Sequence, residues 1–436
     1  MRWVFLLSAG LACAQDTLPL SLKRAVEIAL APEGSPRVAL AEESIKQSQT
    51  GVAQARAAFL PDIETSVTDQ SETVNLRTFG LDFPLPAGLQ FPSLVGPFSV
   101  FDARATAQQS VFDFSSIRKY QSSKVNVEAT KADAETTRNQ VSDTVARAYL
   151  GCLRADAKLE TERANVDLSD ALLKLSNRQK TAGTGLAIEV TRAQVQLAND
   201  RQDLIVAENE RRKAVLRLLR AMGLNLDATI SFTDKLAYKP IDVGPIEAAL
   251  QKAHNERAEL KAQAKREEIA RLNYGSVKSE RLPSLSAFGN YGTIGPEIVG
   301  ALPTRAVGVT LKVPVFDGGR RDARRAESLS ELRQEQIRTR DLKQQVDLDV
   351  RLALDSIRSA ASQVETAREG LALSENELAQ ARRRYEGGVA NSIEVTDAQT
   401  RLDRARDNQI AALYNYNLAR LDLATATGSI TEYLNQ

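Results

Sequence analysis

The sequence predicts an α+β membrane protein, in which long antiparallel helical hairpins are combined with short β-strands in a duplicated chain. Three observations lead to this prediction. Several short motifs recur in the same order, each half contains a very long stretch without proline, and each half carries two segments of alternating polarity. Those segments are about ten residues long, the length that a tilted membrane-spanning strand requires.

Composition agrees with long, solvated helices and does not suggest an enzyme. Aromatic residues make up 5% and charged residues 26% of the 436 residues, which suits elongated helices better than a large compact core. A single histidine, His254, argues against histidine-based metal sites and catalytic triads. No G-x-x-x-x-G-K-S/T loop for phosphate occurs, and the net charge of +1 indicates no nucleic-acid partner. We therefore expect no catalytic activity, no cofactor and no metal.

Residues 1–14 are expected to form a secretory signal peptide. Arg2 supplies a positive charge, and the apolar stretch after it is too short to span a bilayer of about 30 Å. Ala-Cys-Ala at 12–14 fits the small-x-small pattern that a signal peptidase cuts. Cys13 leaves a lipoprotein alternative open, although Gly10 stands where a lipobox usually has leucine.

An internal repeat divides the mature chain into two halves. Ile-Glu-Val-Thr stands at 188–191 and again at 393–396, an offset of 205 residues. Other motifs recur in the same order: Val-Phe-Asp at 111–113 and 315–317, Leu-Pro at 60–61 and 282–283, and Gly223 with Gly428. Such order indicates a duplicated structural unit. We expect a first repeat at 15–230, an equatorial linker at 231–255, a second repeat at 243–430 and a short tail at 431–436.

Each repeat is expected to contain the same elements in the same order. A short helix (21–31 and 244–254) and a medium helix (36–58 and 256–280) come first. Two strands follow, at about 61–72 and 98–112 in the first repeat and at about 283–293 and 304–315 in the second. A very long helix (115–182 and 318–386) leads to a tip at about 181–187 or 386–392. A second long helix completes the unit.

The strand predictions depend on alternating side chains. Apolar residues alternate with small or polar ones in the second repeat: Val307, Val309, Leu311 and Val313 oppose Ala306, Gly308, Thr310 and Lys312. The segments 80–97 and 293–303, rich in proline and glycine, join the strands and are expected to be extracellular loops. The pattern alone leaves an alternative open, in which the strands are two small hairpins of a soluble domain.

The long helices are predicted from missing proline and from a seven-residue period. At 1.5 Å per residue, 115–182 and 318–386 would each be about 100 Å long, as in a coiled coil or a helical barrel. Alanines recur every seven residues at Ala398, Ala405, Ala412, Ala419 and Ala426. Small residues at this spacing let helices approach closely. A plain antiparallel coiled coil would have the same pattern.

Both helical hairpins turn at tips that contain glycine. Glycine permits the left-handed backbone that ends many helices, and a polar residue commonly caps the next helix. Thr184 or Gly185 is expected to form this cap in the first tip, and Asn391 or Ser392 in the second. A good turn would explain the glycines, but it would not explain why Ile-Glu-Val-Thr follows both tips.

These tips, each followed by Ile-Glu-Val-Thr-x-Ala-Gln, and the duplicated plan resemble the TolC-type outer-membrane efflux protein family. The resemblance covers residues 18–430, nearly all of the mature chain. It implies that three subunits each give four strands to a 12-stranded β-barrel in the outer membrane. It also implies that twelve helical strands form an α-barrel through the periplasm, closed at its inner end by the hairpin tips.

The resemblance implies partners and a role. It implies a homotrimer in contact with the lipid of the outer membrane of a Gram-negative-type cell, joined to a periplasmic adaptor protein and an inner-membrane transporter. The expected role is a passive exit duct of a tripartite efflux or type I secretion system. A periplasmic adaptor protein and a soluble periplasmic coiled-coil scaffold are the alternatives, and the sequence does not indicate the cargo.

Three residues of the second hairpin match the family's closed entrance. Glu394 and Asp397 match an acidic pair that rings the tunnel entrance, and residues three apart on a helix share one face. Tyr385 matches an aromatic residue whose polar end helps to hold the entrance shut. The basic residue that often locks this gate is absent near 389–390, and one of the arginines at 382–384 is the candidate to replace it.

The first tip is expected to have a different role. Glu189 matches Glu394, but Arg192 stands where the second repeat has Asp397. The second hairpin is therefore expected to line the entrance, and the first to pack outside it. The resemblance places the adaptor contact on the tips, at Gly183, Thr184, Gly185, Leu186, Gly387, Gly388, Val389 and Asn391.

Overall fold

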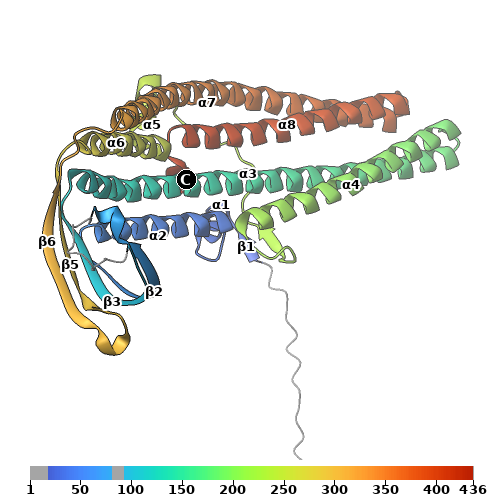
Figure 1. The fold of residues 1–436 in the computed structure, drawn as a ribbon. Coiled ribbons are helices and arrows are strands. Elements are labelled where there is room, and N and C mark those ends of the chain that lie inside the picture. The colour runs from blue at the N-terminus through green and yellow to red at the C-terminus, as the bar shows by residue number, and fades with distance from the viewer. Residues whose placement is uncertain (1–17, 81–92, 436) are drawn as a thin grey trace, which may run out of the picture. The chain divides into compact units, whose positions relative to one another are not determined.

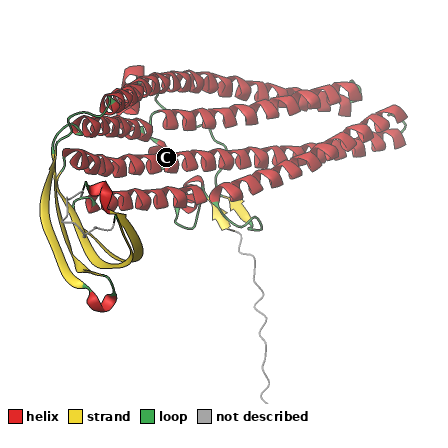
Figure 2. Cartoon of the chain, in the orientation of Figure 1, coloured by secondary structure: helices red, strands yellow, loops and turns green. Residues whose placement is uncertain are grey.

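The computed structural model describes residues 18–80 and 93–435. The predicted signal peptide at 1–14, with Cys13, and most of the predicted loop at 80–97 lie outside these residues. Within them, long helices and one extended sheet account for most of the chain (Figure 1, Figure 2).

The two repeats contain matching series of elements. The first has β1 (Leu18–Leu20), α1 (Leu22–Leu30), α2 (Pro36–Ala57), β2 (Asp62–Asn75), the 3-10 helix η1 (Leu76–Phe79), β3 (Leu94–Phe112), α3 (Phe114–Thr181) and α4 (Ala187–Met222). The strand β4 (Ile230–Phe232) follows. The second has α5 (Ile246–Glu256), α6 (Ala258–Ser279), β5 (Ser284–Gly295), η2 (Ile298–Gly300), β6 (Leu302–Lys312), α7 (Arg320–Glu386), α8 (Ser392–Ala426) and α9 (Ile430–Leu434).

The chain divides into two compact units. The sheet unit consists of Ile45–Thr130 and Gln263–Thr339, and the helical unit consists of Met1–Ser44, Lys131–Ala262 and Arg340–Gln436. Each unit therefore contains segments of both repeats, as expected when the two halves of a chain have the same series of elements.

The long helices are continuous, as their proline-free sequences predict. α3 has 68 residues and α7 has 67, and each is followed by a shorter helix of about half that length, α4 with 36 residues and α8 with 35. In the described part of the chain, none of the helices is both long enough and apolar enough to cross a membrane.

The core of the helical unit is built around Tyr149, which is completely buried. Its hydroxyl donates to the Asp234 carboxylate at 2.8 Å and lies 2.9 Å from the carbonyl oxygen of Leu20. Asp234 also accepts the N–H of Leu22 at 2.9 Å, and β1 pairs in parallel with β4. These contacts fasten the start of the first repeat to the segment after α4, where the equatorial linker at 231–255 is predicted.

The duplication is visible in the backbone. Gly183 and Gly388, which are 205 residues apart, have φ values of +75° and +73°. Gly223 and Gly428 have the same separation, with φ values of +76° and +77°. Because only glycine adopts this conformation without strain, these matches show that the same turns are built at the same places in both halves.

The sheet unit contains one antiparallel sheet in the order β2-β3-β5-β6 (Figure 1). Hairpin β2–β3 comes from the first repeat and hairpin β5–β6 from the second, and β3 pairs with β5 to join them. Each strand overlaps a predicted one, but β3 begins at Leu94, β5 ends at Gly295 and β6 begins at Leu302, within the segments 80–97 and 293–303 that were predicted as loops. β6 ends at Lys312, earlier than the predicted 315, because Pro314 has no N–H to give to the ladder.

Candidate functional site: a two-faced sheet and two hairpin tips

One face of the sheet is apolar. Residues opposite each other in an antiparallel ladder share a face, and Ala105 of β3 lies opposite Thr65 of β2 and Tyr291 of β5. The register places further apolar residues on this face: Ile63, Val67, Ala103, Ala107, Leu285, Ala287, Val307, Val309 and Leu311. Asp69 and Arg305 are charged exceptions on the same face. In a single chain Val307 is 85% exposed and Val67 is 72% exposed. An apolar surface of this extent marks contact with lipid or protein.

The opposite face of the same sheet is polar. It carries Glu64, Ser66, Thr68, Gln70, Asp102, Arg104, Thr106, Gln108, Ser286, Asn290, Thr310 and Lys312. Arg104 donates from Nε to Asp102 Oδ1 at 2.7 Å, so these two charges are paired on the face. The apolar exceptions on this face are Phe98, Val100, Phe288, Ile294 and Leu302. The Phe288 ring lies across Gly308, where an added Cβ would stand 2.7 Å from the ring. One side of the sheet thus suits lipid and the other suits water.

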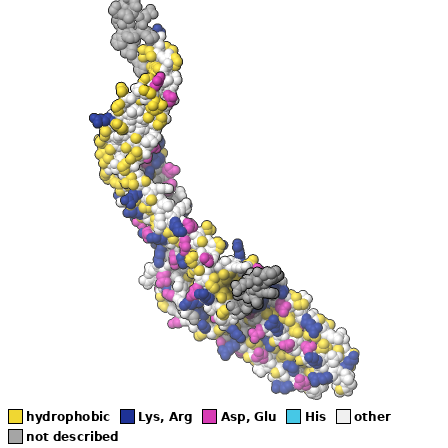
Figure 3. Space-filling model, turned by 90° about the horizontal axis from the view of Figure 1, so that it is seen from below, with side chains coloured by type: hydrophobic (Ala, Val, Ile, Leu, Met, Phe, Trp, Pro, Cys, Tyr) yellow, Lys and Arg dark blue, Asp and Glu magenta, His cyan; other side chains and the backbone are white. Residues whose placement is uncertain are grey.

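Figure 3 shows the surface of the molecule from one side. On the face that it draws, hydrophobic side chains gather over the strands, whereas acidic and basic side chains are scattered over the helices. On the side drawn, the largest gathering of apolar side chains therefore lies over the sheet.

The sheet has two free edges in a single chain. Its order leaves one side of β2 and one side of β6 without a strand partner among the described residues. These edges are long, since β2 has 14 residues and β6 has 11. Unpaired N–H and C=O groups along an edge attract a further strand, and in lipid they must be paired. The sheet is therefore incomplete in one copy of the chain.

The first tip is closed by its own backbone. The N–H groups of Thr184 and Gly185 both donate to the carbonyl of Gln179 at 3.0 Å, and the Thr184 hydroxyl donates to the same oxygen at 3.2 Å. The prediction that Thr184 or Gly185 caps α4 is therefore wrong, because both belong to the turn and Leu186 occupies the N-cap position. Leucine has no acceptor, so Glu189 folds back and accepts the N–H of Leu186 at 3.3 Å.

The second tip has a side-chain cap, as predicted. Asn391 Oδ1 accepts the N–H groups of Ile393 at 3.1 Å and Glu394 at 3.2 Å. Because Asn391 caps the helix, the Glu394 side chain is available for another contact, and it pairs with Arg384 across the tip at 3.0 Å. Of the three arginines at 382–384, Arg384 is the one that pairs with this carboxylate.

Asp397 lies one helical turn beyond Glu394 and is exposed. It forms no ion pair with the part of the chain that the structure describes. The structure therefore joins Glu394 to an arginine and leaves Asp397 as a charge facing solvent. The ring role of both residues remains a prediction.

Both tips expose aliphatic side chains. The exposed fractions are 67% for Leu186, 50% for Ile188, 73% for Val389 and 44% for Ile393. Apolar groups at the end of a hairpin are what a protein partner would cover. The remaining predicted contact residues, Gly183, Thr184, Gly185, Gly387, Gly388 and Asn391, form the turns that carry these side chains.

Tyr385 lies inside the helical unit, with 4% of its surface exposed. Its hydroxyl is 3.2 Å from Ser176 Oγ of α3, and Gln179 Nε2 donates to its carbonyl at 3.4 Å. Its ring packs in a cluster with Leu172 of α3 and Val395 of α8. Burial raises the pKa of the Tyr385 hydroxyl. Tyr385 therefore ties the second hairpin to the first within one chain.

A buried polar seam, which was not predicted from the sequence, lies between α3, α4 and α8. Glu162 of α3 and Asp200 of α4 are only 4% and 5% exposed. Lys158 Nζ lies 2.5 Å from Glu162 Oε1, and Gln196 Nε2 donates to Asp200 Oδ1 at 2.8 Å. Asp403 of α8 belongs to the same seam, because the charges of Asp200 and Glu162 act on it.

The seam changes the acidity of its carboxyl groups. Burial raises the pKa of Asp403 to about 6, and the negative charges of Asp200 and Glu162 add to the effect. Arg406 and Lys158 act in the opposite direction. Burial also raises the pKa of Asp200. Ionising these carboxyl groups therefore opposes the packing of α8 on the first hairpin.

We expect Asp403→Asn to stabilise the protein at pH 7.5. A raised carboxyl pKa means that the folded chain holds the proton more tightly than the unfolded chain, whose value is about 4. This contribution to stability is present below pH 4 and is lost as the pH rises from about 4 to 6. With allowance for solvent screening, the variant should gain about 1–2 kcal/mol at pH 7.5 and nothing at pH 4.

Thermal unfolding of the detergent-solubilised protein at several pH values measures this difference. Asp167→Asn is the matched control, because Asp167 is an exposed carboxylate of α3, the helix that contributes Glu162 to the seam. The assignment is contradicted if Asp403→Asn destabilises the protein at pH 7.5, or if both variants change the pH dependence equally.

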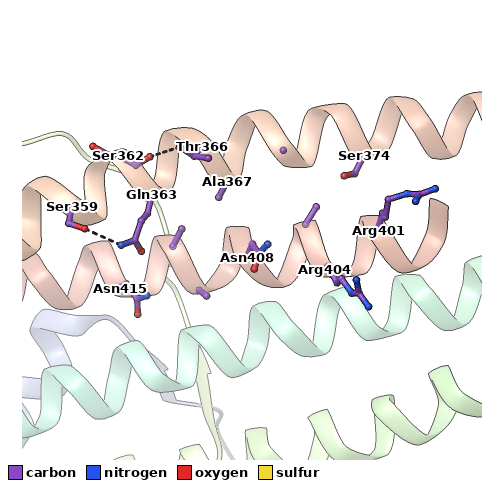
Figure 4. A pocket seen from close by; sticks show the side chains of 14 residues that line it. Ser359, Ser362, Gln363, Thr366, Ala367, Ser374, Arg401, Arg404, Asn408 and Asn415 are labelled. Atoms are coloured by element: carbon purple, nitrogen blue, oxygen red, sulfur yellow. Dashed lines mark hydrogen bonds between the residues drawn. The ribbon is translucent and has the colours of Figure 1, made fainter. Parts of the chain in front are cut away.

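A groove of about 910 Å³ lies between α7 and α8 of the second hairpin (Figure 4). Its lining is small and polar: Ser359, Ser362, Gln363, Thr366, Ser374, Arg401, Arg404, Asn408 and Asn415 are among the residues that line it. Many of these side chains turn to partners on their own helix, as Gln363 Nε2 does to Ser359 Oγ at 3.2 Å. Such a lining is suited to contact with water rather than with lipid.

Known proteins share this arrangement. The family model described as "Outer membrane efflux protein" matches residues 28–224 and 249–429. The chain is 25% identical over 418 residues to the pyoverdine export outer membrane protein OpmQ of Pseudomonas putida, which covers 93% of this chain and 84% of that protein. It is 24% identical over 457 residues to the alkaline protease secretion protein AprF of Pseudomonas aeruginosa, covering 99% of this chain and 89% of that protein.

A solved structure has the same fold. The outer membrane protein VceC of Vibrio cholerae superposes with a TM-score of 0.77 at 17% identity, over 93% of this chain and 96% of that chain. The two matched blocks of the family model also fall one in each repeat of the duplicated fold. The chain belongs to the outer membrane efflux protein family.

Proposed function

We propose that the protein is the outer-membrane exit duct of an efflux or secretion system, built from three copies of the chain. The two-faced sheet is the observation that carries this proposal. Its apolar side suits lipid, its polar side suits a water-filled lumen, and the free edges of β2 and β6 allow copies to join into a closed barrel. Three sheets of four strands would give the 12-stranded β-barrel, and the hairpins would give the periplasmic α-barrel.

A duct of this kind depends on partners for energy and for opening. A periplasmic adaptor protein would cover the aliphatic side chains of the tips, at Leu186, Ile188, Val389 and Ile393. An inner-membrane transporter would drive the transport, because the sequence has no loop of its own for ATP. The relatives OpmQ and AprF are named for pyoverdine export and protease secretion, so the family admits cargoes of very different size.

The proposed entrance lies at the second tip. Three copies of Asp397 would form a ring of negative charge in a narrow mouth, which attracts cations. Glu394 is expected to contribute less, because Arg384 lies 3.0 Å from its carboxylate and offsets its charge. The first tip would lie outside this ring, since Glu189 is occupied as a helix cap.

Planar bilayers containing the purified protein test this proposal. The wild-type protein should form cation-selective pores that Mg²⁺ blocks from the side of the tips. Asp397→Asn should raise the Mg²⁺ concentration for half block on the order of tenfold, because three charges leave the mouth together. Glu394→Gln should have a smaller effect.

Asp355→Asn is the control, since this α7 carboxylate is 79% exposed and lies far from the tip in sequence. Absence of any pore from protein extracted from the outer membrane would overturn the exit duct itself. Pores whose Mg²⁺ block does not change in Asp397→Asn would overturn only the entrance ring.

A further inference from the structure

We infer that Arg305, together with Tyr291 opposite it, binds the phosphate group of a lipid in the outer leaflet of the membrane. The two residues lie side by side on the apolar face of the sheet, on strands β6 and β5. The inference rests on the proposed function, because it takes the apolar face as the surface that lipid covers. It assigns one class of ligand, a phosphorylated lipid, to one place on that surface.

Arg305 ends the apolar part of β6 on the side away from α7. Val307, Val309 and Leu311 follow it at every second position toward α7, and they are 85%, 66% and 64% exposed in a single chain. Before Arg305 the same face of this strand has only Pro303, next to the first residue of the strand. The charge therefore lies at one end of the apolar surface and not in its middle.

This end of the sheet faces the cell exterior in the proposed duct, because β3 and β6 lead into α3 and α7 at the other end. Val313, eight residues after Arg305, is 54% exposed just beyond β6. At about 3.3 Å per residue and a tilt of about 40°, these residues span a height of about 20 Å, close to the apolar band of about 25 Å around a membrane barrel. Arg305 therefore falls near the outer surface of the lipid.

The other edge of the sheet also ends its apolar run with a charge on this side. On β2, Ile63 and Val67 share the apolar face, and Asp69 is the next residue outward on that face. β3 and β5 lie between β2 and β6, so Asp69 and Arg305 of one chain do not meet. Charged residues thus bound the apolar surface at both edges, as expected where lipid tails give way to head groups.

Arg305 is exposed and forms no ion pair with the described part of its own chain. On the polar face, by contrast, Arg104 donates from Nε to Asp102 Oδ1 at 2.7 Å. An unpaired charge in contact with lipid is costly in the middle of the membrane and far less so at the level of the head groups. Arg305 therefore needs an anion from outside its chain, and phosphate is the anion that lipid head groups supply.

Tyr291 completes a site for one phosphate group. It lies directly opposite Arg305 in the ladder and is 67% exposed, and opposed side chains have Cβ atoms about 4.5–5.5 Å apart. The planar guanidinium can donate two parallel hydrogen bonds to phosphate oxygens, and the phenol can donate another. The apolar residues beside this pair would contact the lipid tails, so the site fits a lipid phosphate better than a soluble anion.

Lipid titration of the detergent-solubilised trimer tests this site. The probes are lipid A with two phosphates, the same lipid after removal of both phosphates, and inorganic phosphate. Native mass spectrometry measures the fraction of trimer with bound lipid at each concentration. The wild-type protein should bind the phosphorylated lipid with a Kd at least about tenfold lower than that of the phosphate-free lipid, because charge-assisted hydrogen bonds are stronger than neutral ones. Inorganic phosphate in the same concentration range should not displace the lipid.

Substitutions assign the effect to the two side chains. Arg305→Gln should raise the Kd of the phosphorylated lipid about tenfold and leave that of the phosphate-free lipid unchanged. Arg305→Lys should keep part of the affinity, since lysine retains the charge but not the planar fork. Tyr291→Phe should raise the Kd about threefold. Lys312→Gln is the matched control, because it removes the same charge from the polar face of the same strand and should change neither Kd.

The possible failures have different meanings. A wild-type protein that forms neither trimers nor pores would overturn the proposed function and the lipid site with it. A pore-forming trimer that binds the two lipids equally, or an unchanged Kd in Arg305→Gln, would overturn the lipid site alone. Displacement by inorganic phosphate would assign a site for free anions in its place. Loss of the trimer in Arg305→Gln, with no change in lipid preference, would show that a carboxylate of another copy pairs with Arg305.

Discussion

Ala105→Lys is expected to abolish assembly in the outer membrane, whereas Thr106→Lys in the next position should leave assembly intact. The two residues are neighbours in β3, a central strand of the sheet, and they lie on opposite faces. A lysine on the lipid side of a barrel costs about 2–4 kcal/mol near the middle of the membrane. Three copies would incur this cost in one assembly.

The control, Thr106→Lys, introduces the same side chain into the same strand. Thr106 lies opposite Glu64 on the polar face, so the new amino group would meet water and an opposite charge. It should alter the conductance of the pore but not the amount of protein in the membrane. The measurement is the fraction of protein recovered from outer membranes as a trimer that resists detergent. Equal recovery of the two variants would show that the faces are assigned wrongly.

The alternation of side chains was sufficient to predict the two faces of this sheet, but not which strands are neighbours. Val307, Val309 and Leu311 alternate with Gly308 and Thr310, so the period of two is readable from the sequence alone. The order β2-β3-β5-β6 depends on contacts between residues almost 200 positions apart, which leave no local pattern. The fit of the Phe288 ring over Gly308 depends on the register of hairpin β5–β6, which the alternation of side chains does not determine.

The tips were predictable as turns, and their details were not. The glycines at 183 and 388 fulfil the expected left-handed conformation, because that requirement is local. The cap of α4 was predicted at the wrong residue. The Thr184 hydroxyl could cap the helix or bond within the turn, and it donates to the Gln179 carbonyl of the turn. Which arginine meets Glu394 depends on how two helices rotate against each other, and spacing in the sequence does not determine that.

The spacing of residues in α3 and α4 indicates the buried polar seam. Glu162, Asn165, Ser169 and Leu172 are all buried and follow the spacing of three and four that marks a helix core. Asp200 likewise falls three residues after the buried Leu197. A carboxylate at a core position of a helical seam is rare unless it is paired. The pattern could therefore have indicated a polar contact between hairpins, although not its partner on α8.

Tyr385→Ala is expected to open the tip, and Tyr385→Phe is expected to have a much smaller effect. The ring is buried between the two hairpins of one chain, and removing a buried aromatic ring costs about 3–5 kcal/mol. Phenylalanine would keep that packing and lose only the contact with Ser176 at 3.2 Å, which is worth about 0.5–1.5 kcal/mol.

Two measurements separate loss of packing from general damage. Hydrogen exchange of the tip amides, such as Gly388 N–H, which donates to the Tyr385 carbonyl at 3.1 Å, should accelerate strongly in Tyr385→Ala and slightly in Tyr385→Phe. In cells, entry of a bulky antibiotic that the outer membrane normally excludes should rise in the same order, because a loosened second hairpin no longer closes the proposed entrance.

The control is Tyr238→Ala, because this tyrosine is 40% exposed and packs on Tyr416, away from both tips. It should leave exchange at the tips and antibiotic entry unchanged. If Tyr385→Phe opened the tip as far as Tyr385→Ala, the single contact between its hydroxyl and Ser176 would hold the hairpins together. If neither variant opened the tip, the closed state would depend on contacts between copies. Tyr385 would then contribute only to the packing of one chain.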